Sequence, residues 1–269
     1  MLGSIVGDIV GSIYEFANIK TKDFEFFQPE MERTDDSILC IATADWLLHG
    51  GDVSHYYSRY ALEYPYPMGG YGGMFKGWSI KVARQGIHEP YNSCGNGSAM
   101  RIAPVGWAFE TEREVLEAAK VSASCTHNHP EGIKGAQATA LCIFLARQGH
   151  TASDIRARIE RDFGYDLSMS VKELQRRYSW QGIDGKGDGG ICQDSVPQAI
   201  ICALQAKDFE DAIRNAISIG GDSDTIGCIA GGIAEALYGI PESIKERAWK
   251  YLDETEGRTV RSFIQKYSI

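Results

Sequence analysis

The sequence predicts an all-α fold in which residues 1–269 form one compact domain. Two observations predict this fold class. Apolar residues recur at helical spacing along most of the chain, and no segment alternates between apolar and polar residues as a half-buried strand does. A chain of 269 residues with 43% hydrophobic residues is also long enough to bury a substantial core.

The first predicted helix begins close to the N-terminus. Its apolar residues follow the i, i+3, i+4 spacing of one helix face: Leu2, Ile5, Val6, Ile9, Ile13 and Phe16. Gly3, Gly7 and Gly11 are spaced by four on the same segment. Because glycine lowers helix propensity, this regular spacing predicts a close approach to a second helix.

The same periodicity predicts further helices along the chain. They span residues 35–48, 114–123, 133–147, 153–162, 195–206, 208–218, 225–238 and 242–252. Gly, Pro, Asn and Asp content favours loops at residues 18–27, 66–78, 92–104 and 180–194. We expect residues 163–192 to be a loosely packed loop region, and we expect no strands.

The charge and cysteine content limit the possible functions. The net charge is −9 and the pI is near 5.2, so sequence-independent nucleic-acid binding is not expected. A phosphate-bearing ligand would need metal ions, backbone N–H groups or helix N-termini. The seven cysteines include no Cys-x-x-Cys pair, which is typical of buried thiols in a reducing cytoplasm. Because no apolar run is long enough to cross a bilayer, no membrane association is expected.

Two acidic clusters stand directly before apolar helices. Residues 34–37 read Thr-Asp-Asp-Ser and residues 220–225 read Gly-Gly-Asp-Ser-Asp-Thr. These residue types favour helix capping. Each cluster has more carboxylates than capping needs, however, and hard cations such as Mg²⁺ take carboxylate and hydroxyl oxygens. The sequence is compatible with two interpretations: each cluster caps its own helix, or the two clusters meet at one cation site. The first helix carries two further acids. Asp8 is a candidate for a structural hydrogen-bonding partner, and Glu15 is a third candidate for the acidic site.

Two glycine-rich segments are candidate ligand loops. Gly95 and Gly97 surround Asn96, and such a segment can direct several backbone N–H groups at one anion, although an ordinary turn explains it equally well. Tyr71 lies in the segment 69–75, where its ring could stack on a planar base or anchor the loop. His127 and His129 give only a weak zinc pattern, and a loop histidine that contacts a phosphate or hydroxyl is an equal alternative.

Five of these motifs, taken in order, resemble a known family. They are "GDIVGSIYE", "TDDS", "GNGSAMRIAPVG", "THNHPEGIKGAQA" and "GGDSDTIGCIAGGIAEALYG". Together they resemble the ADP-ribosylglycohydrolase family, which includes dinitrogenase reductase-activating glycohydrolase and the ADP-ribosylarginine and ADP-ribosylserine hydrolases. The resemblance spans about residues 1–240. It implies an orthogonal all-α fold with two magnesium ions in a cleft, with Mn²⁺ able to substitute.

The resemblance implies roles for particular residues. The implied metal ligands are Thr34, Asp35, Asp36, Asp222, Asp224 and Thr225. Glu15 and Asp36 are the implied catalytic carboxylates. The implied substrate-binding residues are Gly70, Tyr71, Gly72, Gly95, Asn96, Gly97, Ser98, Met100 and His127. Relatives often carry arginine before the Gly-Tyr-Gly sequence, where this chain has Gly69, so no arginine contact is carried over.

The expected function is therefore magnesium-dependent hydrolysis of the glycosidic bond between ADP-ribose and an acceptor. The acceptor is an ADP-ribosylated protein side chain or small molecule, and intact ADP-ribose is released by a cytoplasmic monomer. A two-metal nucleotide phosphohydrolase is the first alternative, because paired metals also suit phosphoryl transfer. A non-catalytic ADP-ribose-binding protein on the same fold is the second.

Overall fold

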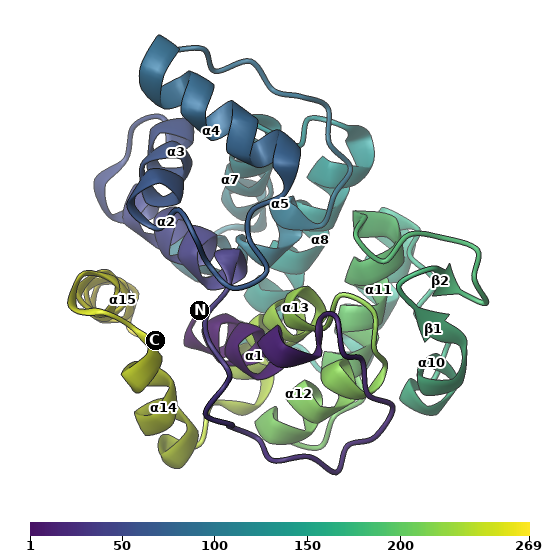
Figure 1. Cartoon of the computed structure of the whole chain (residues 1–269). Helices are drawn as coiled ribbons and strands as arrows, with labels where there is room; N and C mark the ends of the chain where they lie inside the picture. The colour runs from purple at the N-terminus through teal and green to yellow at the C-terminus, as the bar shows by residue number, and fades with distance from the viewer.

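A computed structural model describes all 269 residues and confirms the all-α prediction (Figure 1). The α-helices are α1 (Leu2–Gly11), α2 (Asp35–His49), α3 (Val53–Glu63), α4 (Gly73–Gln85), α5 (Gly97–Met100), α6 (Ala103–Ala108), α7 (Glu112–Ser124), α8 (Pro130–Arg147), α9 (Ala152–Phe163), α10 (Val171–Arg177), α11 (Cys192–Leu204), α12 (Phe209–Ser218), α13 (Ser223–Tyr238), α14 (Glu242–Ala248) and α15 (Glu254–Tyr267). Two 3₁₀ turns, η1 (Ser12–Tyr14) and η2 (Trp249–Tyr251), complete the helical content.

The expectation of no strands is wrong in one small place. β1 (Tyr178–Ser179) pairs antiparallel with β2 (Gly182–Ile183) through a two-residue connection. This hairpin lies within residues 163–192, which also contain α10 and bury Tyr165, Leu167 and Leu174. Strands of two residues are too short to show an alternating pattern, so periodicity alone does not reveal them.

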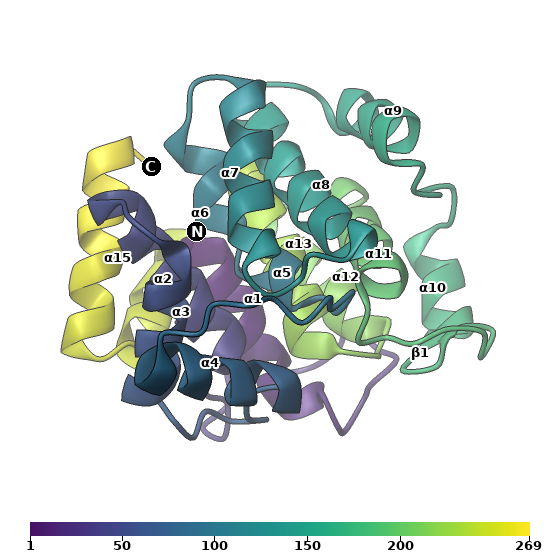
Figure 2. The ribbon, with the colours of Figure 1, turned by 90° about the horizontal axis from the view of Figure 1, so that it is seen from above.

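Helix α13 lies at the centre of the molecule, with α1, α8, α11 and α12 packed around it (Figures 1 and 2). α1 and α13 approach closely because glycines face each other: a Cβ at Gly7 would overlap the carbonyl of Gly227, and a Cβ at Gly3 would overlap that of Gly231. The spacing of glycines in the first helix therefore serves the close helix approach that it predicts.

One contiguous cluster of 70 buried residues forms the core. The outer helices cover it on opposite sides, with α14 and α15 on one side and α9, α10 and the hairpin on the other (Figures 1 and 2). All seven cysteines are free thiols. None of the helices combines the length and apolar character that crossing a bilayer requires.

Several helices lie where the sequence predicts none. α3, α4, α10 and α15 are the longest of these, and the predicted loop 66–78 overlaps the start of α4. Five glycines in residues 69–77 favour a loop locally. The buried ring of Trp78, together with Phe75 and Val82 on the same helix face, outweighs that preference.

Candidate functional site

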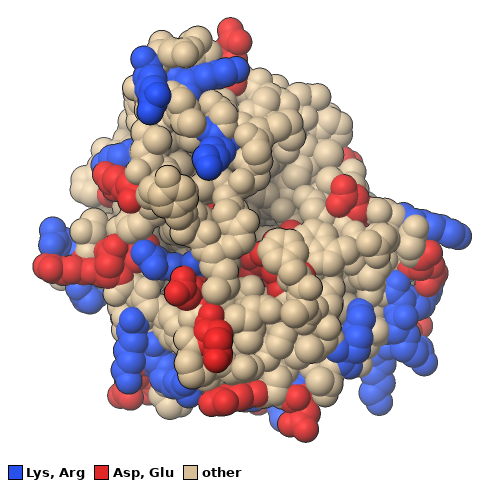
Figure 3. Space-filling view, viewed as in Figure 1, with Lys and Arg blue, Asp and Glu red and all other residues tan.

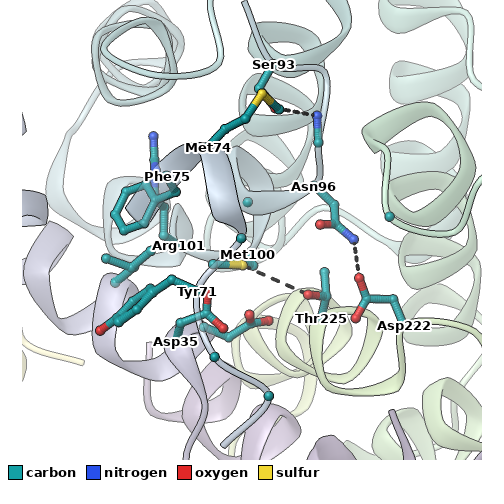
Figure 4. A pocket seen from close by; sticks show the side chains of 18 of the residues that line it. Asp35, Tyr71, Met74, Phe75, Ser93, Asn96, Met100, Arg101, Asp222 and Thr225 are labelled. Carbon is teal, nitrogen blue, oxygen red and sulfur yellow. Dashed lines mark hydrogen bonds between the residues drawn. The ribbon is translucent and has the colours of Figure 1, made fainter. Parts of the chain in front are cut away.

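A cavity of about 610 Å³ opens on one face of the molecule, where Figure 3 shows a hollow with acidic atoms beside it. The N-terminal ends of α2 and α13 form one side, and the segments before α4 and α5 form the other (Figure 4). Its volume is typical of small-molecule sites. The structure brings these predicted site residues together on its walls: Glu15, Asp35, Asp36, Gly70, Tyr71, Gly72, Gly95, Asn96, Gly97, Met100, His127, Asp222, Asp224 and Thr225.

Two predicted site residues do not line the cavity. Thr34 is fully buried behind Asp35 and Asp36 as the N-cap of α2, where its hydroxyl oxygen accepts the backbone N–H of Asp36 at 3.2 Å. Ser98 is also fully buried, and its hydroxyl donates to the carbonyl of Gly132 at 2.7 Å. Its side chain therefore contributes packing below the ligand loop.

Asp8 holds the start of α2 from below. Its buried carboxylate accepts the backbone N–H groups of Thr34 at 3.0 Å and Ser37 at 3.1 Å. It also accepts both hydroxyls, that of Thr34 at 2.6 Å and that of Ser37. Because the Thr34 hydroxyl donates its proton to Asp8, an oxygen lone pair remains for a further partner.

Asp36 carries an orphaned buried oxygen. Its Oδ2 atom has no hydrogen-bond partner, although the residue is only 2% exposed. Burial, followed by the neighbouring charges of Asp8 and Asp35, raises the pKa of Asp36 well above its usual value. A buried carboxylate without a donor is costly unless a cation neutralises it. The partly exposed Asp35 lies next to it, and burial followed by the charge of Asp8 raises the pKa of Asp35 in the same direction.

The α13 side of the cavity depends on a tight turn. Gly220 and Gly221 have φ of +69° and +78°, a conformation that favours glycine. Asn18 clamps this turn, because its side chain accepts the backbone N–H of Gly221 at 2.8 Å and donates to the carbonyls of Gly221 and Glu15. The turn thereby presents Asp222 as the N-cap residue of α13.

Asn96 orients Asp222 across the cavity, because its Nδ2 atom donates to the Asp222 carboxylate at 2.7 Å (Figure 4). The side chain predicted to bind substrate thus holds an acidic group in place. The hydroxyl of Thr225 lies 3.9 Å from the sulfur of Met100 (Figure 4).

Glu15 joins the acidic side from the end of η1. One carboxylate oxygen each of Glu15, Asp222 and Asp224 lie within 4.8 Å of one another. Burial, followed by the charges of Asp222 and Asp8, raises the pKa of Glu15 to about 7. Gly69 makes room for this side chain, because a Cβ there would lie 2.8 Å from Glu15 Oε2. Gly69 also has φ of +75°, so a larger residue would be disfavoured both by its contact with Glu15 and by the backbone conformation.

The donor set fits hard divalent cations. The carboxylates of four aspartates and one glutamate and the hydroxyl of Thr225 line the same cavity, and one buried carboxylate oxygen has no partner at all. Oxygen-only ligand sets of this kind suit Mg²⁺ and Mn²⁺. The pair His127 and His129 does not form a zinc site, because the His129 ring caps α8 and His127 lies under the glycine loop.

The opposite side of the cavity has no acidic side chain, and its cationic residue, Arg101, is fully buried. Gly97 packs against His127, whose Nε2 atom would lie 3.1 Å from a Cβ at that glycine. Burial, followed by the charge of Arg101, lowers the pKa of His127 well below its usual value, so the ring is neutral at pH 7. The first backbone N–H groups of α5, at Gly97 and Ser98, have no intrahelical acceptor. They are available to an anionic ligand.

Several lining residues are absent from the sequence prediction. Ser93 lies inside the predicted loop 92–104 but is not among the predicted site residues, and Tyr91 directly precedes that loop. Trp180 lines the cavity from the connection between β1 and β2. No local signal marks it, because its place depends on a bond from its indole Nε1 to the carbonyl of Glu15 at 2.8 Å.

Comparisons with known proteins agree with this architecture. A family model described as ADP-ribosylglycohydrolase matches residues 1–267. ADP-ribosylhydrolase ARH3 from Homo sapiens is 30% identical over 329 aligned positions, covering 95% of this chain and 89% of the human protein. ADP-ribosylarginine hydrolase Tri1 from Pseudomonas putida (strain GB-1) is 27% identical, covering 93% and 73%. A solved structure described as an ADP-ribosylglycohydrolase-related protein complex aligns with a TM-score of 0.68 at 24% identity, covering 98% of this chain and 96% of that one, which shows a shared fold.

Proposed function

The chain belongs to the ADP-ribosylglycohydrolase family, and from this premise we propose that this hydrolase cleaves the glycosidic bond between ADP-ribose and an acceptor. The products are intact ADP-ribose and the unmodified acceptor. The acceptor is an ADP-ribosylated protein side chain or a related small conjugate. Among the similar proteins, the Pseudomonas putida relative is named for ADP-ribosylarginine, which supports a modified side chain as one such acceptor.

One observation carries the proposal: the cavity has an acidic end and an end without acidic side chains. The carboxylates of Glu15, Asp35, Asp36, Asp222 and Asp224 lie at one end, and the other is lined by the glycine loop, the neutral ring of His127 and the buried Arg101. Backbone N–H groups hold a diphosphate without a strong electrophile at phosphorus. The ribose that carries the acceptor then lies at the acidic end.

We assign two divalent cations, Mg²⁺ with Mn²⁺ able to substitute, to the acidic end. The residues that would hold them are Thr34, Asp35, Asp36, Asp222, Asp224 and Thr225. Asp36 Oδ2 supports this assignment most directly, since it has no other partner. When bound, such ions supply positive charge beside the ribose hydroxyls and lower the pKa of water.

The residues of the chain supply positioning and proton transfer. Cleavage of a bond to the anomeric carbon passes through a state with oxocarbenium character. Glu15, whose pKa lies near 7, is suited to take a proton from the attacking water at neutral pH. Asp36 is the second catalytic carboxylate in the proposal, and its charge at the acidic end favours the cationic sugar. Asn96 keeps Asp222 oriented through the bond described above.

We further propose that residues 1–269 act as a single-domain monomer in the cytoplasm. One contiguous core of 70 buried residues supports a single domain. Seven free thiols support a reducing compartment. Sedimentation equilibrium of the purified chain measures the oligomeric state directly.

The reaction is tested by hydrolysis in ¹⁸O-labelled water with Mg²⁺ and a panel of defined ADP-ribosylated peptides and small molecules. Mass spectrometry should find the label on the anomeric hydroxyl of released ADP-ribose, with the diphosphate intact. Label in AMP or ribose phosphate would instead establish a nucleotide phosphohydrolase. Tight ADP-ribose binding without release from any substrate would establish a binding protein.

A further inference from the structure

A large aromatic side chain stands in solvent beside Trp180, which lines the cavity. Phe16 directly follows Glu15 and is 78% exposed. Its ring stacks on that of Trp180, with centroids 6.4 Å apart and planes inclined by 4°. A single exposed apolar residue is common, but this ring stacks on a residue of the cavity wall and directly follows Glu15 in the chain. Its position next to the site is what points to a role in binding.

The chain fixes Trp180 firmly in this position. Its indole Nε1 donates to the carbonyl of Glu15 at 2.8 Å, and its own carbonyl accepts the N–H of Gly189 at 2.7 Å. A Cβ at Gly189 would lie 3.2 Å from the Trp180 backbone, so glycine allows this close return of the chain. The ring of Trp180 lines the same cavity as the acidic cluster. It is a fixed wall.

The position of this wall identifies the group that it faces. Trp180 is bonded to the backbone of Glu15, and the carboxylate of Glu15 belongs to the cluster with Asp222 and Asp224. Under the proposed function, the anomeric carbon lies at this acidic end and the diphosphate lies toward Gly97. A group that leaves the anomeric carbon toward solvent then passes Trp180 and Phe16.

We propose that Phe16 and Trp180 form a stacking platform for the acceptor, and that the acceptor group it takes is a planar cation of the guanidinium class. This inference rests on the proposed function. A guanidinium stacks on aromatic faces and is attracted by their negative π-surface, with tryptophan the strongest partner. The adjoining carboxylates favour a cation in the same place. An aliphatic hydroxyl acceptor has neither a flat face nor a charge and leaves the platform unused.

The test uses two peptides of otherwise identical sequence, one carrying ADP-ribose on arginine and the other on serine. Hydrolysis is measured with Mg²⁺ for the wild type, Phe16→Ala, Trp180→Ala and Trp180→Phe. Tyr66→Ala is the matched control, because Tyr66 is 89% exposed and lies outside the cavity wall. Circular dichroism and calorimetry with free ADP-ribose accompany each variant.

We expect Phe16→Ala and Trp180→Ala to lower kcat/KM on the arginine peptide by about tenfold, as loss of a cation–π contact implies. In Phe16→Ala, activity on the serine peptide should change by less than about threefold, because that acceptor makes no such contact, and ADP-ribose affinity should be unchanged. Both Trp180 variants also lose the indole bond to the carbonyl of Glu15, so they should lose some activity on both peptides, and Trp180→Phe should keep the preference for the arginine peptide. If Trp180→Ala fails to fold, Phe16→Ala decides alone.

Three results overturn the inference while leaving the proposed function intact. They are equal losses on both peptides in Phe16→Ala, no loss on either peptide in Phe16→Ala, and a wild type that cleaves only the serine peptide. A wild type that releases ADP-ribose from neither peptide, nor from any other conjugate, contradicts the proposed function itself.

Discussion

Asp8 in α1 accepts two hydrogen bonds from Thr34, from its hydroxyl at 2.6 Å and from its backbone N–H at 3.0 Å. A carboxylate on one helix thus caps the start of another that lies 26 residues further along the chain. This contact fixes Asp35 and Asp36, the next two residues, relative to the core. Both the stability of the fold and its metal binding should therefore depend on Asp8.

Asp8→Asn should lower the free energy of unfolding by roughly 3 kcal/mol, because the amide has one acceptor oxygen and its NH₂ group faces the donors that Asp8 satisfies. Urea denaturation measures the change. Combined with Thr34→Val, the double mutant should show a coupling energy of about 1 kcal/mol or more. Strictly additive effects would mean that Asp8 does not cap α2.

The two acidic helix starts were predictable because capping is local. The sequence places a hydroxyl or carboxylate directly before each apolar helix, and α2 and α13 begin at Asp35 and Ser223. The convergence of the two starts was not visible in either segment. It depends on the glycine contacts between α1 and α13 and on the reach of Asp8, all of which link distant residues.

The segments that sequence reasoning missed have weak or contradictory local signals. Helix α4 contains Gly73 and Gly77, which favour loops, but tertiary burial of Trp78 decides its structure. Trp180 lies in a two-residue connection whose position depends on the carbonyl of Glu15. Helix α15, by contrast, has a capping box formed by Asp253 and Glu256, a signal that the sequence contains and the periodicity analysis overlooked.

Gly11→Ala should weaken both folding and metal binding. A Cβ at Gly11 would lie 2.5 Å from the Cα and 2.6 Å from the backbone N of Asp224. α1 must then move away from α13 next to Asp224, a proposed metal ligand, which should lower the free energy of unfolding by about 1–3 kcal/mol. Thermal melting with and without Mg²⁺ should show a lower Tm and a smaller response to the ion.

Gly77→Ala is the control for this substitution. Gly77 lies in the middle of α4, and nothing stands within 4 Å of its added Cβ. Alanine should be neutral there or stabilise the helix by up to about 1 kcal/mol. If Gly11→Ala melts and responds to Mg²⁺ as Gly77→Ala does, the close approach does not position Asp224.

Mg²⁺ should stabilise the protein more at pH 8 than at pH 5.5. The pKa of Asp8 is raised to about 6 and that of Asp36 is raised well above 3.8, so the folded protein binds protons more tightly than the unfolded chain. Without divalent ions, this contribution to stability is fully present below about pH 4 and is lost as the pH rises through the folded-state pKa values. Bound cations offset the free-energy cost of burying ionised carboxylates. Their binding requires these carboxylates to be deprotonated, which a higher pH favours.

Asp36→Asn separates these effects. Removing one buried charge should raise the Tm of the metal-free protein at neutral pH and reduce the rise that Mg²⁺ causes. Scanning fluorimetry in EDTA and in Mg²⁺ at both pH values measures this, with Asp23→Asn at an exposed position as the control. An Mg²⁺-induced shift that is equal at both pH values and unchanged in Asp36→Asn would refute the assignment.

Glu15→Gln should separate binding from turnover. The variant keeps the size of the side chain but removes the charge, so ADP-ribose affinity should stay within about threefold while kcat falls roughly 10²–10⁴-fold, as expected for loss of a general base. Burial and the neighbouring carboxylates raise the pKa of Glu15 to about 7 when no cation is bound, and bound cations lower it, so wild-type kcat/KM in Mg²⁺ should rise with pH and level off below about pH 7. The Glu15→Gln variant should lack this rise of kcat/KM with pH, because amides do not titrate.

The control is Glu25→Gln, at an exposed position, which should keep both the rate and the pH profile. Unchanged turnover in Glu15→Gln would assign the proton transfer to Asp36.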